Sequence, residues 1–156
     1  MTSLTIVRRH SIAEFDSWFD QHVPLARRAV EAYQDGHHEA AQALAVSVCD
    51  TYFKRFLAGK SYKKMAAAIS MDAANTGSIA VAFNVLYALV PGVPFLTEWR
   101  PEGTTETPTK FSRHVSIHFA NVEQMTKPNA TLAIMFMTSL TVAIDYAAKR
   151  VAGSQD

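Results

Sequence analysis

Apolar residues recur at spacings of three and four along most of this 156-residue chain, the pattern of helices that bury one face. The clearest case is the stretch 41–56, whose apolar stripe consists of Ala41, Leu44, Ala45, Val48, Tyr52 and Phe56. No stretch alternates apolar and polar residues strongly enough to predict a sheet. The sequence therefore predicts an all-α fold, an antiparallel bundle of about five to six helices. We expect one domain over 1–156, with loose termini at 1–10 and 151–156.

Capping residues and helix breakers set the expected boundaries. Ser11 and Glu14 form a capping box, Pro24 suits the first turn of a second helix, and Asp35-Gly36 supplies a stop after Tyr33. Pro128 and Asn129 open the last helix. The predicted helices are 11–20, 24–33, one ending at Gly59, 61–71, 78–90, and one from 128 onward.

The last helix has apolar residues on two faces. One face carries Leu132, Met135, Phe136, Leu140, Ala143 and Ala147, and Ile134, Met137 and Val142 lie elsewhere. One face is expected to pack on the bundle and the other to meet a second copy of the chain in a homodimer. A fully buried central helix explains the same residues equally well.

The composition favours a compact protein with only local contacts to nucleic acid. Hydrophobic residues make up 49% of the chain and charged residues 19%, and the formal net charge is +1. A protein that binds nucleic acid through a broad electrostatic surface is usually more basic. Any RNA contact is therefore expected to be local and to depend on geometry.

The chain is expected to be cytoplasmic and to have no membrane contact. Met1–His10 lacks the apolar core and cleavage site of a signal peptide. Ile79–Leu96 approaches the length of a membrane span, but Asn84 and the segment 91–94 interrupt it. The single cysteine, Cys49, lies in an apolar run and is predicted to be a small buried side chain that suits a reducing compartment.

The segment Arg113–His118 follows a polar loop predicted over Thr97–Ser112 and is the strongest candidate for chemistry. Arginine binds phosphate oxygens with several N–H donors, and histidine titrates near neutral pH. The five-residue offset places Arg113 and His118 roughly 140° apart on a regular helix, so one ligand meets both only through irregular geometry or a second subunit. Val115 and Ile117 are expected to point inward, leaving Arg113, His114 and Ser116 to face a cleft. Asp50 is a candidate partner for Arg113 or His118.

Other interpretations of these residues, without catalysis, also stay open. Arg113 can be a surface cation and His118 a hydrogen-bonded core histidine. His114 and His118 form an i, i+4 pair that would suit a metal, but no third ligand is obvious and Arg113 would repel a divalent cation. His37-His38-Glu39 is better explained as a solvated helix start. We predict no metal and no cofactor.

An all-helical domain with Arg113, a polar residue, three further residues and His118, followed by a long C-terminal helix, resembles the HEPN superfamily (higher eukaryotes and prokaryotes nucleotide-binding domains). The stretches 36–41 and 111–146 are also similar to bacterial members, and the resemblance loosely covers Arg28–Ala147. It implies an antiparallel helical bundle, a homodimer that joins two motifs in one cleft, and metal-independent cleavage of RNA by attack of the 2′-hydroxyl.

In such a site His118 would move protons and Arg113 would stabilise the extra negative charge of the transition state. His114 would orient the phosphate, with Ser116 and Asp50 as further binding residues. Three functions follow from the sequence: a dimeric HEPN-like endoribonuclease from a toxin or phage-defence system with an antitoxin or regulatory partner; a noncatalytic HEPN-like module for nucleotide or RNA binding or dimerisation; or a small metal- or ligand-binding helical protein.

Overall fold

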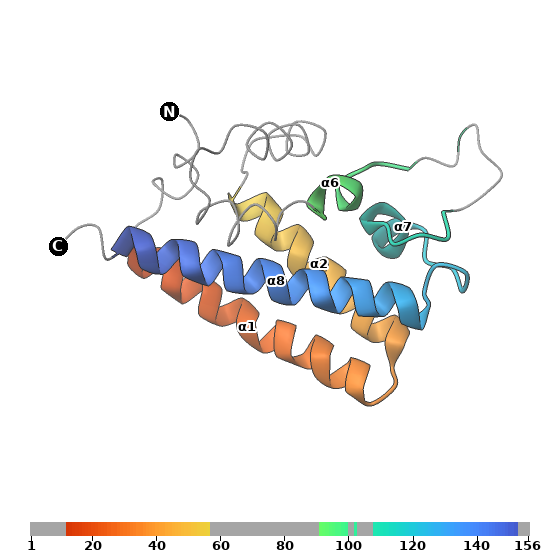
Figure 1. Cartoon of the computed structure of the whole chain (residues 1–156), viewed down its shortest axis with the longest axis horizontal. Coiled ribbons are helices and arrows are strands. Elements are labelled where there is room, and N and C mark those ends of the chain that lie inside the picture. The colour runs from red at the N-terminus through yellow and green to blue at the C-terminus, as the bar shows by residue number, and fades with distance from the viewer. Residues whose placement is uncertain (1–11, 57–90, 100–101, 103–107, 153–156) are drawn as a thin grey trace.

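The structure is a computed structural model, and it describes residues 12–56, 91–99, 102 and 108–152. These residues are helical or irregular and contain no strand, which confirms the all-α prediction for the described part of the chain. The helices are α1 (Ile12–Gln34), α2 (His38–Phe56), α6 (Gly92–Phe95), α7 (Arg113–His118) and α8 (Lys127–Ala152) (Figure 1). The helices predicted at 61–71 and 78–90 and the loose terminus predicted at 1–10 lie outside the described residues. α8 extends to residue 152, and residues 153–156 of the loose terminus predicted over 151–156 lie outside the described residues.

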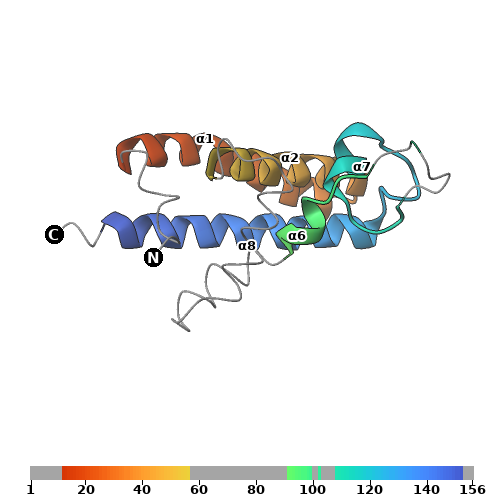
Figure 2. The same ribbon diagram turned by 90° about the horizontal axis from the view of Figure 1, so that it is seen from above.

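The three long helices form the body of the protein, but they are not all antiparallel. The hydroxyls of Tyr33, near the end of α1, and Thr131, near the start of α8, are 2.6 Å apart. The hydroxyls of Tyr52 and Thr141 pair the later parts of α2 and α8 at 3.4 Å. Thus α1 runs against both of its neighbours, whereas α2 and α8 run in the same direction (Figures 1 and 2). The prediction of an antiparallel bundle holds for α1 alone.

One continuous helix replaces the two that were predicted before Gly36. Pro24 lies inside α1 and its side chain is exposed. Proline removes one backbone hydrogen bond and normally favours a break. Trp18 and Phe19 before it and Leu25 and Ala26 after it all contact the same core, so packing on both sides of Pro24 keeps the helix continuous.

The turn between α1 and α2 forms as its residues predict. Gly36 has a φ of 85°, a left-handed conformation that glycine adopts without steric cost. The N–H of Gly36 donates to the carbonyl of Tyr33 at 3.1 Å, and the N–H of His37 donates to that of Ala32 at 2.8 Å. These two bonds form a Schellman motif that satisfies the last carbonyls of α1.

Alanines line the contacts between the three long helices. The set, named here the alanine seam, comprises Ala26, Ala29, Ala41, Ala45, Ala130, Ala133 and Ala143, all buried. Larger side chains complete the core around it, among them Tyr52, Phe53, Phe95, Phe136 and Met137. Small side chains allow helix axes to approach closely, so α8 turns its alanines inward.

This orientation corrects the predicted faces of α8. Phe136, Leu140 and Ala143 are buried as expected, but Leu132 and Met135 are at least half exposed. Met137, which was placed off the stripe, is buried. Val142 is exposed with Leu132 and Met135, and these three residues define the α8 outer stripe.

One described helix is long and apolar enough to cross a membrane by length and composition. It is Lys127–Tyr146, with a mean hydropathy of 1.2, and 39% of this window is buried inside the structure. Buried core helices of soluble proteins meet the same criterion. The inner face of this helix packs against α1 and α2, and Leu132, Met135 and Val142 on its outer face are exposed.

Candidate functional site

The candidate segment forms α7, a short helix that packs against α2 at the end of the bundle where α2 and α8 begin (Figures 1 and 2). Arg113, Val115 and Ser116 are buried. His114 is partly exposed, and Ile117 and His118 are exposed. At 100° per residue the three buried residues fill one half of the helix circumference. The other three residues, His114, Ile117 and His118, define the exposed half of α7.

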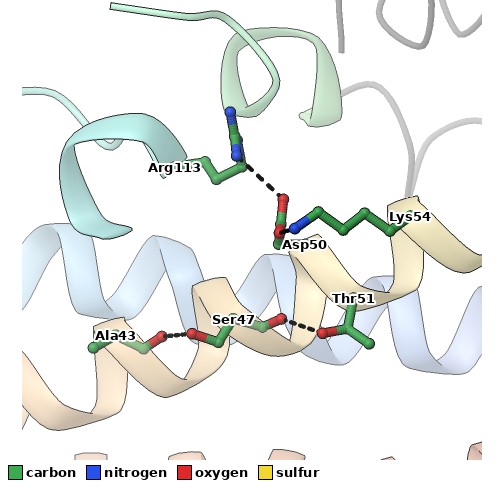
Figure 3. A network of polar contacts seen from close by, with 6 residues as sticks. All are labelled: Ala43, Ser47, Asp50, Thr51, Lys54 and Arg113. Atoms are coloured by element: carbon green, nitrogen blue, oxygen red, sulfur yellow. Dashed lines mark hydrogen bonds and ion pairs between the residues drawn. The ribbon is translucent and has the colours of Figure 1, made fainter. Parts of the chain in front are cut away.

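Arg113 lies inside the protein, where it pairs with Asp50 of α2. The Arg113 side chain is 3% exposed, and its Nη1 is 3.3 Å from Oδ1 of Asp50. Oδ2 of the same carboxylate lies 2.7 Å from Nζ of Lys54 (Figure 3). Asp50 therefore bridges a buried cation on α7 and a surface cation on α2. This ion pair holds α7 on the bundle.

A second buried contact between α7 and α2 consists of neutral polar groups. Nε2 of Gln42 donates to the hydroxyl of Ser116 at 3.0 Å and to Oε1 of Gln124 at 2.8 Å. The Ser116 hydroxyl is 2.8 Å from the carbonyl of Ser112, to which it donates. Gln42, Ser116 and Gln124 are all buried, and we call them the amide network. Buried polar groups of this kind stabilise a structure only while each finds its partner.

The amide network also fixes the chain on both sides of α7. Nε2 of Gln124 is 3.3 Å from the carbonyls of Lys110 and Ser112. Nδ2 of Asn129 donates to the carbonyls of Thr109 and Gln124, each at 2.8 Å. In the irregular segments before and after α7, side-chain amides thus bind backbone carbonyls of residues that lie outside the helices.

Aromatic and imidazole rings gather beside the exposed half of α7. The ring centroids of His114 and His118 are 5.0 Å apart, and those of His114 and Phe119 are 5.5 Å apart. Phe119 in turn meets the edge of Trp99 at 5.2 Å. We call Trp99, His114, His118 and Phe119 the ring cluster. Its members are partly or fully exposed.

His114 is oriented by the backbone of the segment before α7. The N–H of Trp99 donates to Nδ1 of His114 at 3.0 Å. Because Nδ1 accepts this bond, the proton of the neutral ring lies on Nε2. A metal at Nε2 would move that proton to Nδ1, where it would oppose the Trp99 N–H. Metal binding by His114 therefore requires loss of this hydrogen bond, and the described residues hold no group of three metal-ligating side chains.

Cys49 is buried next to Asp50 on α2 and is a core residue, as predicted. Burial raises the pKa of the Cys49 thiol well above its usual range, and the negative charge of Asp50 adds to the rise. Burial likewise raises the pKa of Tyr52, against a hydrogen bond from Thr141. Both side chains therefore stay neutral near neutral pH.

Two of the residues that were expected to face a cleft are buried instead. Arg113 and Ser116 were expected to face it, but both point toward α2. Ile117 was expected to be buried with Val115 but is 38% exposed. The two residues are two positions apart, which on a helix is a rotation of about 200°, so they cannot lie on the same face. The pairing of Asp50 with Arg113 is confirmed.

Three residues of the site, Gln42, Gln124 and Trp99, were not predicted from the sequence. Gln42 left a weak signal, since it shares the spacing of three and four with buried Ala45, Val46 and Cys49. Gln124 and Trp99 lie in irregular segments, where no periodic pattern marks a buried or contacting residue.

Comparison with protein-family models, with curated proteins and with solved structures finds no match for this chain.

Proposed function

We propose that the chain is a HEPN-like module that binds single-stranded RNA through the exposed half of α7 and the ring cluster. The contact of four rings at one end of the bundle supports this function best. Unpaired bases stack on aromatic and imidazole rings, which is the main mode of sequence-tolerant RNA binding. A nearly neutral protein can bind RNA in this way because stacking needs no broad basic surface.

The buried ion pair supports a binding module without catalysis over the arginine–histidine pair that the sequence suggests. Arg113 is committed to Asp50, and His118 is exposed on the opposite half of α7. Within one chain the guanidinium is therefore a poor candidate for contact with a scissile phosphate. In this proposal Arg113 positions α7, and His114 and His118 contact the RNA.

A binding titration tests the proposal. Fluorescence anisotropy of a labelled single-stranded oligoribonucleotide in chelator would give the dissociation constant. Phe119→Ala should weaken binding about 5- to 150-fold, since a base stacked on an aromatic ring contributes about 1–3 kcal/mol. Val122→Ala is the matched control, because Val122 is 86% exposed in the same loop and takes no part in the ring contacts. No binding by the unchanged protein, or equal binding by both variants, would refute the proposal.

A second candidate, metal-independent endoribonuclease activity, is favoured by the two neighbouring imidazoles. Attack of a ribose 2′-hydroxyl on the adjacent phosphorus needs a group that accepts a proton and a group that donates one or stabilises charge. His118 would accept the proton of the 2′-hydroxyl and return it to the departing 5′-oxygen, and Nε2–H of His114 would donate a hydrogen bond to the phosphate. Incubation of RNA with the protein in chelator should then give cyclic-phosphate and 5′-hydroxyl ends, and His118→Ala should abolish them. Intact RNA would eliminate this candidate while leaving the binding proposal standing.

The α8 outer stripe supports a homodimer. Leu132, Met135 and Val142 recur at spacings that place them on one exposed face. A second copy of the chain would cover these apolar side chains. Light scattering should report a dimer that Met135→Glu converts to a monomer, and a monomeric unchanged protein would contradict it.

A further inference from the structure

The hydrogen bond between Trp99 and His114 ties together two segments of the ring cluster that are 15 residues apart in sequence. An imidazole can accept a hydrogen bond only at a nitrogen that carries no proton. Imidazolium carries protons on both nitrogens and has no acceptor. The contact observed between the Trp99 N–H and Nδ1 therefore exists only while His114 is neutral.

We propose that His114 is a pH-sensitive clamp, which accepts the Trp99 N–H in its neutral form and loses this hydrogen bond when it takes up a second proton. This inference concerns regulation of the ring cluster and goes beyond RNA binding, since the clamp operates without any ligand. Trp99 also meets the edge of Phe119, so this bond lies at one end of the ring cluster.

Charged and titratable side chains lie on each of the elements that pack around His114. On α7 these are His118, whose ring centroid is 5.0 Å from that of His114, and Arg113. On α2, which packs against α7, they are Asp50 and Lys54, which form the ion pairs described above. Glu98 directly precedes Trp99.

Nitrogen NMR of the imidazole rings tests the resting state. The neutral protein should show the His114 proton on Nε2 and a bare Nδ1. A proton on Nδ1 would overturn the proposal at once.

Tryptophan fluorescence tests the loss of this hydrogen bond. The chain has two tryptophans, and the emission of Trp18, which stacks on His22 with centroids 4.3 Å apart, would overlap that of Trp99. Trp18→Phe leaves Trp99 as the reporter. In this background the Trp99 emission should change with pH at the same midpoint as the His114 ring measured by NMR.

Two substitutions separate the clamp from a general pH effect. His114→Asn retains an acceptor near the position of Nδ1 but does not titrate, so the Trp99 emission should stay constant near neutral pH. His118→Asn should keep the transition, because His118 takes no part in the hydrogen bond between Trp99 and His114. A transition that survives His114→Asn, or one that His118→Asn abolishes, would overturn the clamp. These outcomes are independent of whether the protein binds RNA.

Discussion

The Arg113–Asp50 pair predicts an asymmetric response to mutation. Asp50→Ala removes the carboxylate that serves both Arg113 and Lys54 and leaves the guanidinium buried beside α2. Removing one partner of a buried pair costs about 3–5 kcal/mol of the free energy of unfolding. Arg113→Met should cost less, about 1–3 kcal/mol, because Asp50 keeps Lys54 at 2.7 Å and methionine fills part of the space.

Urea unfolding followed by far-UV circular dichroism measures these free energies. The matched control is Lys54→Met, which removes the surface member of the same network. The Lys54 side chain is 62% exposed, so its loss should cost less than about 1 kcal/mol. The double variant Asp50→Ala/Arg113→Met should be more stable than the sum of the single changes implies, with a coupling free energy of about 2 kcal/mol.

Two results would refute this reasoning. If Asp50→Ala and Arg113→Met each cost under about 1 kcal/mol, the pair contributes no more than a surface ion pair. If the two costs simply add, Asp50 and Arg113 do not interact in solution, and Arg113 would be available for a phosphate after all.

Three further predictions concern the scaffold. Gln124→Ala should cost about 1–3 kcal/mol in urea unfolding, because its buried hydrogen-bond partners lose their contacts, and an unchanged stability would mean that water replaces the amide. Gly36→Ala should lower the free energy of unfolding by about 1 kcal/mol through backbone strain alone, since a Cβ there meets no atom within 4 Å. Unchanged stability of Gly36→Ala would contradict this prediction, whereas an equal loss in Ala40→Gly would not bear on it. Cys49 should resist alkylation at mildly basic pH and react only in denaturant, and rapid labelling of the folded protein would show that its thiol is accessible.

Local chemistry predicted the parts of the fold that depend on neighbouring residues. The stop at Gly36 and the opening of α8 near Pro128 follow from capping rules that operate within a few residues. The continuity of α1 at Pro24 depends on residues of other helices that contact both flanking turns. No pattern within the helix itself carries that information.

The inward face of α8 could not be read from hydrophobicity. Leucine and methionine rank above alanine on any such scale, yet Ala130 and Ala133 are buried and Leu132 and Met135 are exposed. The choice depends on how closely α1 and α2 approach, which is a property of the assembled helices.

The candidate site likewise contains residues that the sequence predicts and residues that it does not. Asp50 was found because a lone acid on an apolar helix needs a partner, and Arg113 supplies it. The amide network was not predicted because glutamine carries no charge and is mostly found on protein surfaces, so nothing in the sequence marked these two glutamines as buried. Its partners come from segments far apart in the sequence, which only the folded chain brings together.

The alanine seam has a consequence for engineering this protein. Where helices meet through methyl groups, any enlarged side chain must push two backbones apart, so filling the interior is an unpromising route to a more robust variant. Polar replacements of Leu132, Met135 and Val142 leave the seam untouched. That outer strip is where solubility can be adjusted without disturbing how the helices fit.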